Sequence, residues 1–201
     1  MNYLAHLSLS RPTVASRVGN LLGDFMRGVE VDTLPQAVRL GLANHRLVDR
    51  LTDTHAAVRD ARALFSPARR RFAGVALDVL FDHFLWRHWS LFYSEPRDAT
   101  IRLYYRQLVE GRELMPPAMA AAVTRLVEHD LLSAYARLAG VSQALDVMAG
   151  RIRFANRFAG IGEELDRHYA QLEALFLEFF PRLHRDVRRE AIEWQPANRH
   201  C

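Results

Sequence analysis

The chain has 201 residues, of which 50% are hydrophobic and 25% charged, and its 27 basic residues, all arginine, outnumber 23 acidic ones. This length fits one domain with a substantial core, and the modest excess of arginine favours an anionic partner such as a phosphate ester or an acidic protein. An ordinary solvated surface is an equally weighted alternative. The one cysteine, Cys201, excludes a disulfide framework and a thiolate metal site, so any metal must be held by histidines and carboxylates.

The first nine residues have no basic segment ahead of an apolar run, and no apolar run reaches the roughly 18 residues of a membrane span. Both features argue against a secreted or membrane protein. The sequence also lacks a glycine-rich phosphate loop and a base-stacking motif. We therefore expect a cytoplasmic protein that binds neither membranes nor nucleic acid.

Apolar residues recur at spacings of three and four throughout, while alternation of period two with β-branched residues is absent. We predict an all-α, single-domain helical bundle over residues 1–194 and a frayed tail over 195–201. Capping residues, prolines and glycines set the helix ends. In chain order the predicted helices cover residues 13–28, 35–51, 54–65, 66–89, 99–112, 116–139, 142–154 and 163–192.

The helix over 66–89 carries two carboxylates in strongly apolar surroundings. Asp78 and Asp82 are four residues apart and so share one face, with His83 about 100° further round. Buried carboxylates repel each other and lose hydration, so they require a cation or a shared proton. A divalent metal satisfies this requirement, and carboxylates paired with arginine are the structural alternative.

His45, Asp49 and Asp53 recur every four residues along one helical stripe, a spacing that allows two ligands, or one ligand and its supporting carboxylate, from a single helix. The alternative is a solvated face of ion pairs that ends at Asp53, and on this segment alone it is favoured. Asp24 interrupts an apolar helix between small residues and is weak evidence alone. His6, in an apolar setting, is by itself more typical of a core histidine than of a ligand.

His129 and Asp130 form the one literal His-Asp dipeptide, which is the hallmark of the HD-domain phosphohydrolases. They follow a helix segment that looks surface-facing, so we interpret them as a solvated pair and not as metal ligands.

Taken together, these segments resemble the acyl carrier protein phosphodiesterases, a divergent all-α relative of the HD-domain phosphohydrolases. Five blocks carry the resemblance in the same order and spacing, and together they span nearly the whole chain. They are residues 2–7 (NYLAHL), 19–28 (GNLLGDFMRG), 45–53 (HRLVDRLTD), 77–89 (LDVLFDHFLWRHW), and 165–169 (LDRHY) with 179–182 (FFPR).

The resemblance implies an HD-like, Mn²⁺-dependent hydrolase that converts holo acyl carrier protein to apo carrier protein and 4′-phosphopantetheine, with Mg²⁺ or Fe²⁺ as other possible metals. The implied metal shell is Asp24, His45, Asp78, Asp82 and His83, with His6 and Asp49 as supporting ligands. Asp24, Asp82 and His83 are the implied catalytic residues. The adjacent pair here is Asp82-His83 and not His-Asp, which leaves the assignment of individual ligands open.

Arginines near these blocks are candidates for binding the anionic substrate. Arg27, Arg46 and Arg50 could hold the phosphate oxygens, although a solvated role is at least as good for each. Arg69, Arg70 and Arg71 lie in the predicted first turn of the helix over 66–89, where they oppose the helix dipole. An unfavourable placement suggests a use, and we expect them to dock the carrier protein unless arginine is simply the default surface residue.

Two other functions fit the same residues. An HD-like phosphohydrolase could act on a nucleotide or another small phosphoester, because a fold does not fix the substrate. A non-catalytic helical adaptor for acidic proteins could hold the inward carboxylates as ion pairs with arginine. Metal content separates the adaptor from the enzymes, and the substrate separates the two enzymes.

Overall fold

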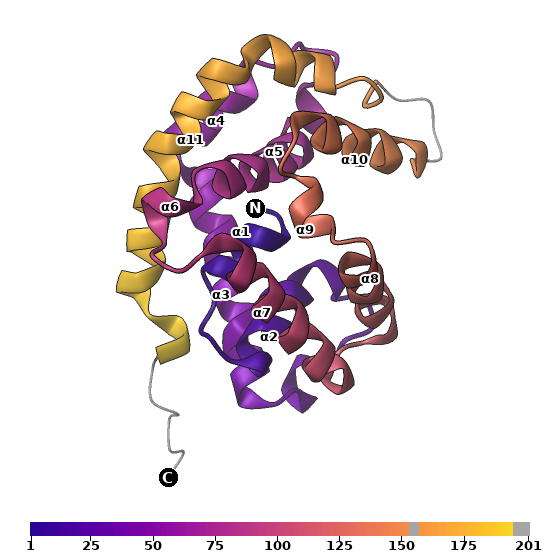
Figure 1. Ribbon diagram of the computed structural model, residues 1–201, viewed down its shortest axis with the longest axis vertical. Coiled ribbons are helices and arrows are strands. Elements are labelled where there is room, and N and C mark those ends of the chain that lie inside the picture. The colour runs from indigo at the N-terminus through magenta and orange to yellow at the C-terminus, as the bar shows by residue number, and fades with distance from the viewer. Residues whose placement is uncertain (153–156, 195–201) are drawn as a thin grey trace.

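The computed structural model describes residues 1–152 and 157–194, and over these residues the chain forms helices and no strand. The predicted all-α helical bundle is confirmed (Figure 1). The predicted tail, 195–201, and the end of the predicted helix over 142–154 lie outside the described residues. No described helix is long and apolar enough to cross a membrane.

The helical elements are labelled α for α-helices and η for 3₁₀ turns. In chain order they are α1 (Tyr3–Ser8), α2 (Val14–Leu22), η1 (Gly23–Phe25), η2 (Val31–Thr33), α3 (Gln36–Thr54), α4 (Ala56–Ala63), η3 (Arg70–Phe72), α5 (Ala73–Arg87), α6 (Trp89–Phe92), α7 (Arg97–Glu110), η4 (Gly111–Leu114), α8 (Pro117–Glu128), α9 (Leu131–Ala134), α10 (Leu138–Gly150), α11 (Gly162–Glu190) and η5 (Ile192–Trp194).

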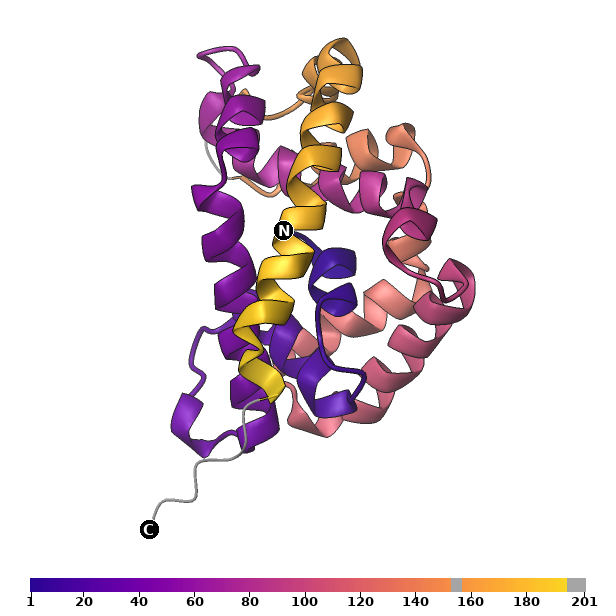
Figure 2. The same ribbon diagram turned by 90° about the vertical axis from the view of Figure 1, so that its left-hand side faces the viewer.

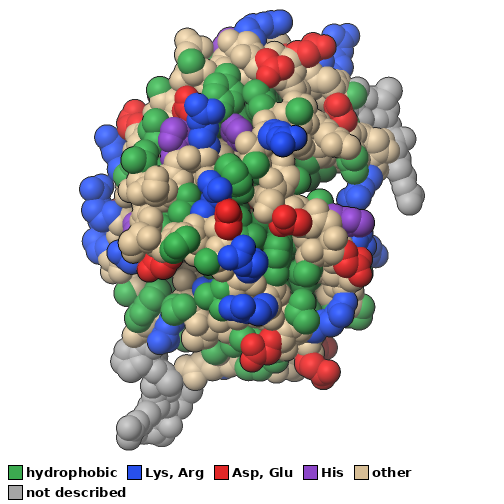
Figure 3. Space-filling model, in the orientation of Figure 1, with side chains coloured by type: hydrophobic (Ala, Val, Ile, Leu, Met, Phe, Trp, Pro, Cys, Tyr) green, Lys and Arg blue, Asp and Glu red, His purple; other side chains and the backbone are tan. Residues whose placement is uncertain are grey.

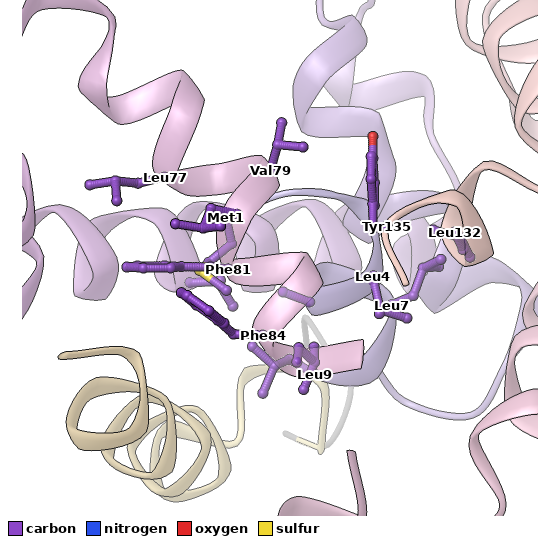
Figure 4. Packing of buried hydrophobic residues seen from close by; sticks show 14 of the residues in the cluster. Met1, Leu4, Leu7, Leu9, Leu77, Val79, Phe81, Phe84, Leu132 and Tyr135 are labelled. Atoms are coloured by element: carbon purple, nitrogen blue, oxygen red, sulfur yellow. The ribbon is translucent and has the colours of Figure 1, made fainter. Parts of the chain in front are cut away.

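The short helix α1 lies inside the bundle, where it contacts α2 and α5. Its apolar residues Leu4 and Leu7 are 0% and 1% exposed, and they join the same core as Phe81 and Phe84 of α5 (Figure 4). Burying a leucine side chain contributes roughly 1.5–3 kcal/mol, so tertiary packing holds a helix that is too short to be stable alone. The N-terminus consequently lies at the middle of the molecule (Figure 1).

Helices α2 and α3 cross with their backbones almost touching. A Cβ atom added at Gly41 would lie 2.5 Å from the Ser16 carbonyl oxygen and 3.0 Å from the Gly19 Cα, and one at Gly19 would overlap the Val38 carbonyl oxygen. Only glycine permits this distance of approach. The crossing brings the polar residues at the end of α2 against the middle of α3.

The long helix α11 runs along one side of the bundle and contacts α3, α4 and α5 (Figures 1 and 2). Its apolar stripe includes Leu172, Phe176 and Phe180, which are all 0% exposed. The helix therefore covers the face of the bundle that α3, α4 and α5 leave apolar.

Three predicted helix boundaries differ most from the structure. The predicted helix over 66–89 begins at Ala73, because Ser66 does not cap it: its N–H and hydroxyl instead donate to Glu164 at 3.0 and 2.7 Å. The predicted helix over 116–139 is divided at Asp130, whose φ of 46° is left-handed. Thr13 does cap α2, by accepting the Ser16 N–H at 3.3 Å, but α2 ends at Leu22 and not near residue 28.

Candidate metal centre

Two histidines and a carboxylate from two helices converge beside the N-terminus. His6 of α1 and His45 of α3 stack their rings with centroids 4.0 Å apart. Their Nε2 atoms lie 3.3 and 3.0 Å from the two carboxylate oxygens of Asp49. The ligand atoms of these three residues lie within 4.8 Å of one another, so they form a possible His-His-Asp metal site, which we call the His-His-Asp cluster.

The ring of His45 is held from both sides by oxygen atoms. Its Nδ1 lies 2.8 Å from the backbone oxygen of Asn20, and its Nε2 faces Asp49. An oxygen at each ring nitrogen requires either a doubly protonated imidazole or a cation in place of the second proton. Burial lowers the pKa of His45, but the hydrogen bond to Asp49 and the charges of Asp49 and Asp24 together raise it above its ordinary value.

His6 has the opposite electrostatic environment. It is 0% exposed, and burial lowers its pKa to about 3, so its imidazole is neutral at physiological pH. Its Nε2 lies 3.1 Å from the carbonyl oxygen of Met1, and its Nδ1 is buried without a hydrogen-bond partner among the described residues. A neutral, partly unsatisfied imidazole is the form that binds metals.

Hydrogen-bond donors and a positively charged group converge on the carboxylate of Asp49. Besides the two histidines, the α-amino group of Met1 lies 3.4 Å from one of its oxygens. Burial raises the pKa of Asp49, but the hydrogen bonds from His45 and His6 and the charge of the α-amino group lower it well below its ordinary value. Asp49 is therefore ionised at any pH at which the protein would work.

Asp78 and Asp24 lie beside the His-His-Asp cluster. Asp78 of α5 is 3.0 Å from the α-amino group of Met1, which so bridges Asp78 and Asp49. Asp24, in η1, is an exposed residue, but partial loss of hydration at its carboxyl group raises its pKa. The charge of His45 opposes this rise, and the charges of Asp49 and Asp78 add to it. Asp24 and Asp78 thus add two carboxyl groups beside that of Asp49.

Asp82 has a different environment. It is 0% exposed, and its two oxygens accept the backbone N–H groups of Leu4 and Ala5 at 2.8 and 2.9 Å. These are free N–H groups at the start of α1, which Asn2 does not cap through its side chain. Burial raises the pKa of Asp82 to about 7, and the two N–H donors oppose that rise. Asp82 therefore attaches α1, and with it His6, to α5.

We expect Asp82→Asn to lower the stability of the fold by about 1–3 kcal/mol, because the amide turns a donor toward one of two buried N–H groups. Urea unfolding followed by circular dichroism would measure this change, with Asp98→Asn, an exposed carboxylate, as the control. Unchanged stability would show that the contacts to Leu4 and Ala5 contribute little.

The structure does not bring His83 to the cluster. Its Nδ1 lies 2.7 Å from the carbonyl oxygen of Tyr135 and its Nε2 lies 2.7 Å from the hydroxyl of Tyr169 on α11. Nearby, His88 faces Glu173 of α11 at 2.8 Å. His83 thus follows Asp82 in the sequence but points to another part of the bundle, about 100° round the helix.

The predicted phosphate ligands lie on the surface. Arg27, Arg46 and Arg50 are exposed, and among the described residues none of them is within ion-pair distance of a cluster side chain.

Two other arginines, Arg125 and Arg151, lie near enough to the hydroxyl of Tyr3 to lower the pKa of that hydroxyl. Burial and the charge of Asp24 act the other way, and the pKa rises to about 12. This group of side chains near Asp24 gave no signal in the sequence.

The three arginines of the predicted docking segment make different contacts within the protein. Arg69 donates to the carbonyl oxygens of Arg157 and Ala159 at 3.0 and 3.2 Å and lies 3.5 Å from Glu164. Arg70 donates to the carbonyl oxygen of Phe65 at 3.3 Å, and Arg71 lies over the ring of Phe72. The segment precedes α5 as a 3₁₀ turn, so these residues do not occupy the first turn of that helix.

Asp130 of the His-Asp dipeptide is exposed and lies at the break between α8 and α9. Its carboxylate accepts the hydroxyl hydrogen of Tyr105 at 2.7 Å. The dipeptide therefore shapes a helix junction, and nothing in its described surroundings resembles the His-His-Asp cluster.

A divalent cation fits the cluster chemically. Two imidazoles and a carboxylate are ligands that Mn²⁺, Fe²⁺ and Zn²⁺ accept. The unsatisfied Nδ1 of His6 and the two oxygens that face His45 show that the polar groups are incompletely balanced by the protein alone. His6, His45 and Asp49 would hold such an ion.

Fold and cluster together define a class: an all-α protein with a His-His-Asp group between its helices, its two histidines buried, that could hold a divalent cation. The chain belongs to the acyl carrier protein phosphodiesterase family, whose sequence profile it matches over residues 1–183. Every residue of the cluster, together with Asp24 and Asp78, lies inside that match. No solved structure matches the chain significantly.

Individual relatives agree with the family match. An acyl carrier protein phosphodiesterase of Serratia proteamaculans is 37% identical over 193 residues, which cover 96% of this chain and 100% of the relative. The proteins of that name from Escherichia coli O157:H7 and Klebsiella pneumoniae are each 35% identical. They cover 96% and 92% of this chain, and 100% and 96% of their own lengths.

Proposed function

We propose that this protein is a divalent-metal-dependent phosphodiesterase that hydrolyses holo acyl carrier protein to apo carrier protein and 4′-phosphopantetheine. The observation that carries the proposal is the family match over residues 1–183, which contains the whole His-His-Asp cluster. We propose Mn²⁺ as the metal and the cytoplasm as the location.

The chain's own residues suggest a division of roles. His6, His45 and Asp49 would hold the metal, with Asp78 and Asp24 as further carboxylates beside it. A bound divalent ion lowers the pKa of water and polarises phosphoryl oxygens. The raised pKa of Asp24 suits it to accept a proton from the attacking water, whose oxygen forms the new bond to phosphorus as the bond from phosphorus to the serine oxygen breaks. The proton taken up by Asp24 balances the one that the leaving serine oxygen gains as it becomes a hydroxyl group.

The remaining candidates have supporting roles in this proposal. Asp82 positions α1, and His83 links α5 to Tyr135 and Tyr169. Arg27, Arg46 and Arg50 remain proposed ligands for the phosphate oxygens of the substrate.

The proposal is tested by incubating the purified protein with Mn²⁺ and holo carrier protein and weighing the product by mass spectrometry. We expect apo carrier protein and free 4′-phosphopantetheine, with no product after treatment with a chelator and recovery when Mn²⁺ is restored. Metal-dependent cleavage of nucleotides but not of holo carrier protein would favour the nucleotide phosphohydrolase. A protein that binds no metal and cleaves neither would be an adaptor.

We further propose that the carrier protein docks through opposite charge at Arg69, Arg70 and Arg71, the basic segment that precedes α5. The exposed arginines are interspersed with acidic side chains on the face in Figure 3, so a local cluster is needed to steer an acidic partner. We expect KM for holo carrier protein to rise severalfold as the Debye length shortens to about 8 Å near physiological salt, while kcat changes little. A KM that is independent of salt would contradict electrostatic docking.

A further inference from the structure

The C-terminal turn η5 packs on α3, the helix that carries His45 and Asp49. Its residue Glu193 is 2% exposed. A glutamate is seldom buried so completely unless other groups pair with its carboxylate. The carboxylate accepts the hydroxyl hydrogen of Ser16, the side-chain amide of Asn20 at 3.2 Å and the backbone N–H of Arg11 at 3.0 Å. The end of the described chain is thereby bonded to the inside of α2.

The side chain of Asn20 is held at both ends of its amide. Its Nδ2 donates to Glu193 and to the carbonyl oxygen of Ser16 at 3.0 Å, while its Oδ1 accepts from the amide of Asn44 at 2.9 Å. Because a carboxylate and a carbonyl oxygen only accept hydrogen bonds, Glu193 and the Ser16 carbonyl group together determine which way the amide of Asn20 faces. Asn20 is 0% exposed and Asn44 1%, so water does not compete for these bonds.

The backbone oxygen of the same residue, Asn20, faces Nδ1 of His45 at 2.8 Å. It belongs to the last turn of α2, where carbonyl groups lack a partner within the helix. A proton on Nδ1 leaves Nε2 of His45 for the opposite side, where Asp49 and the proposed metal lie. Asn20 thus connects η5 to the orientation of a candidate metal ligand.

We propose that Glu193 is a positioning residue for the metal centre: by fixing Asn20, it holds the carbonyl group that keeps Nε2 of His45 directed at the metal. The inference rests on the proposed function and adds to it a residue from outside the family match, which ends at residue 183. The alternative is that Glu193 only anchors η5 and has no effect on metal binding.

The alternatives are separated by a matched pair of variants in the full-length protein. Glu193→Ala removes the contact to Asn20. Arg11→Ala removes a different anchor of the same turn, the bond from the Arg11 guanidinium to the backbone oxygen of Glu193 at 2.8 Å, and leaves the carboxylate in place. Glu193→Gln, which keeps an oxygen for Asn20, is the conservative variant. All three are compared by thermal unfolding, by Mn²⁺ titration and by hydrogen exchange of the His45 Nδ1–H in the metal-free protein.

We expect both alanine variants to lower Tm. Only Glu193→Ala should weaken Mn²⁺ binding, by about three- to tenfold, below the 10–100-fold typical of direct partners of a metal ligand. It should also speed the exchange of the His45 Nδ1–H at least about threefold, and Glu193→Gln should restore both values. Equal effects of the two alanine variants at equal loss of Tm would overturn the proposal.

The exchange measurement is independent of metal and of catalysis. A metal-free wild-type protein without a protected His45 Nδ1–H would contradict the positioning role even if Glu193→Ala does not fold. Failure of the wild-type protein to bind Mn²⁺ would refute the proposed function instead, while the exchange data would still report whether Glu193 orders His45.

Discussion

Asp49→Asn is expected to lower kcat/KM for holo carrier protein at least about 100-fold, which corresponds to about 2.7 kcal/mol. Asp49 is the carboxylate on which His6, His45 and the α-amino group of Met1 converge, so the substitution removes the negative charge that a metal at this point requires. Mn²⁺ binding should weaken in parallel. The fold should persist, because the side chain is 41% exposed and fills no core space.

The matched control is Asp53→Asn, one turn further along the same helix. Asp53 is 61% exposed and pairs with Arg62, an ion pair of the kind that contributes less than about 1 kcal/mol. We expect wild-type activity and metal binding there. Activity that survives in Asp49→Asn, with its circular dichroism unchanged, would remove Asp49 from the metal site.

Gly23→Ala is expected to weaken Mn²⁺ binding about 10–100-fold and to lower activity with it. A Cβ atom at residue 23 would overlap the ring of His45, at the atoms Cδ2, Nε2 and Cε1. The ring must then turn away from Asp49, or α2 and α3 must separate, which we expect to reduce stability by about 1–3 kcal/mol. Mn²⁺ titration and urea unfolding would measure the two effects.

Gly74→Ala is the matched control, because there is room for a Cβ atom at residue 74. A Cβ atom there would meet Arg62 at 3.5 Å, an ordinary contact, inside the helix α5. It should be neutral or stabilise the protein by about 0.5–1 kcal/mol. If Gly23→Ala binds Mn²⁺ as well as Gly74→Ala does, the close approach of His45 to α2 is not needed for the site.

Helix content could be predicted from the sequence because apolar spacing reports which face of a helix is buried. Boundaries were less predictable where a distant residue competes for the cap. Ser66 reads as an N-cap in the sequence, but Glu164, on a helix nearly a hundred residues later, takes its hydrogen bonds. Asp130 likewise interrupts an apolar pattern that continues without a break in the sequence.

The site was only partly predictable for a similar reason. The spacing of His45 and Asp49 places both on one face of α3, and the structure indeed joins them at 3.0 Å. The sequence neighbours Asp82 and His83 point to different parts of the bundle, which spacing alone did not resolve. Asn20 and Glu193 act across 173 residues of sequence, a distance over which no local pattern carries information.

The close contact of α2 and α3 at Gly19 and Gly41 limits which substitutions this protein can accept. At Gly19 and Gly41 any side chain meets backbone atoms, which cannot move aside as a flexible side chain can. A saturation screen scored by activity should therefore find these positions as intolerant as Asp49, although neither glycine carries a group that could bind a metal. Scoring the same library by folded yield would separate them: variants at Gly19 and Gly41 should be lost from the folded fraction, and variants at Asp49 should remain in it.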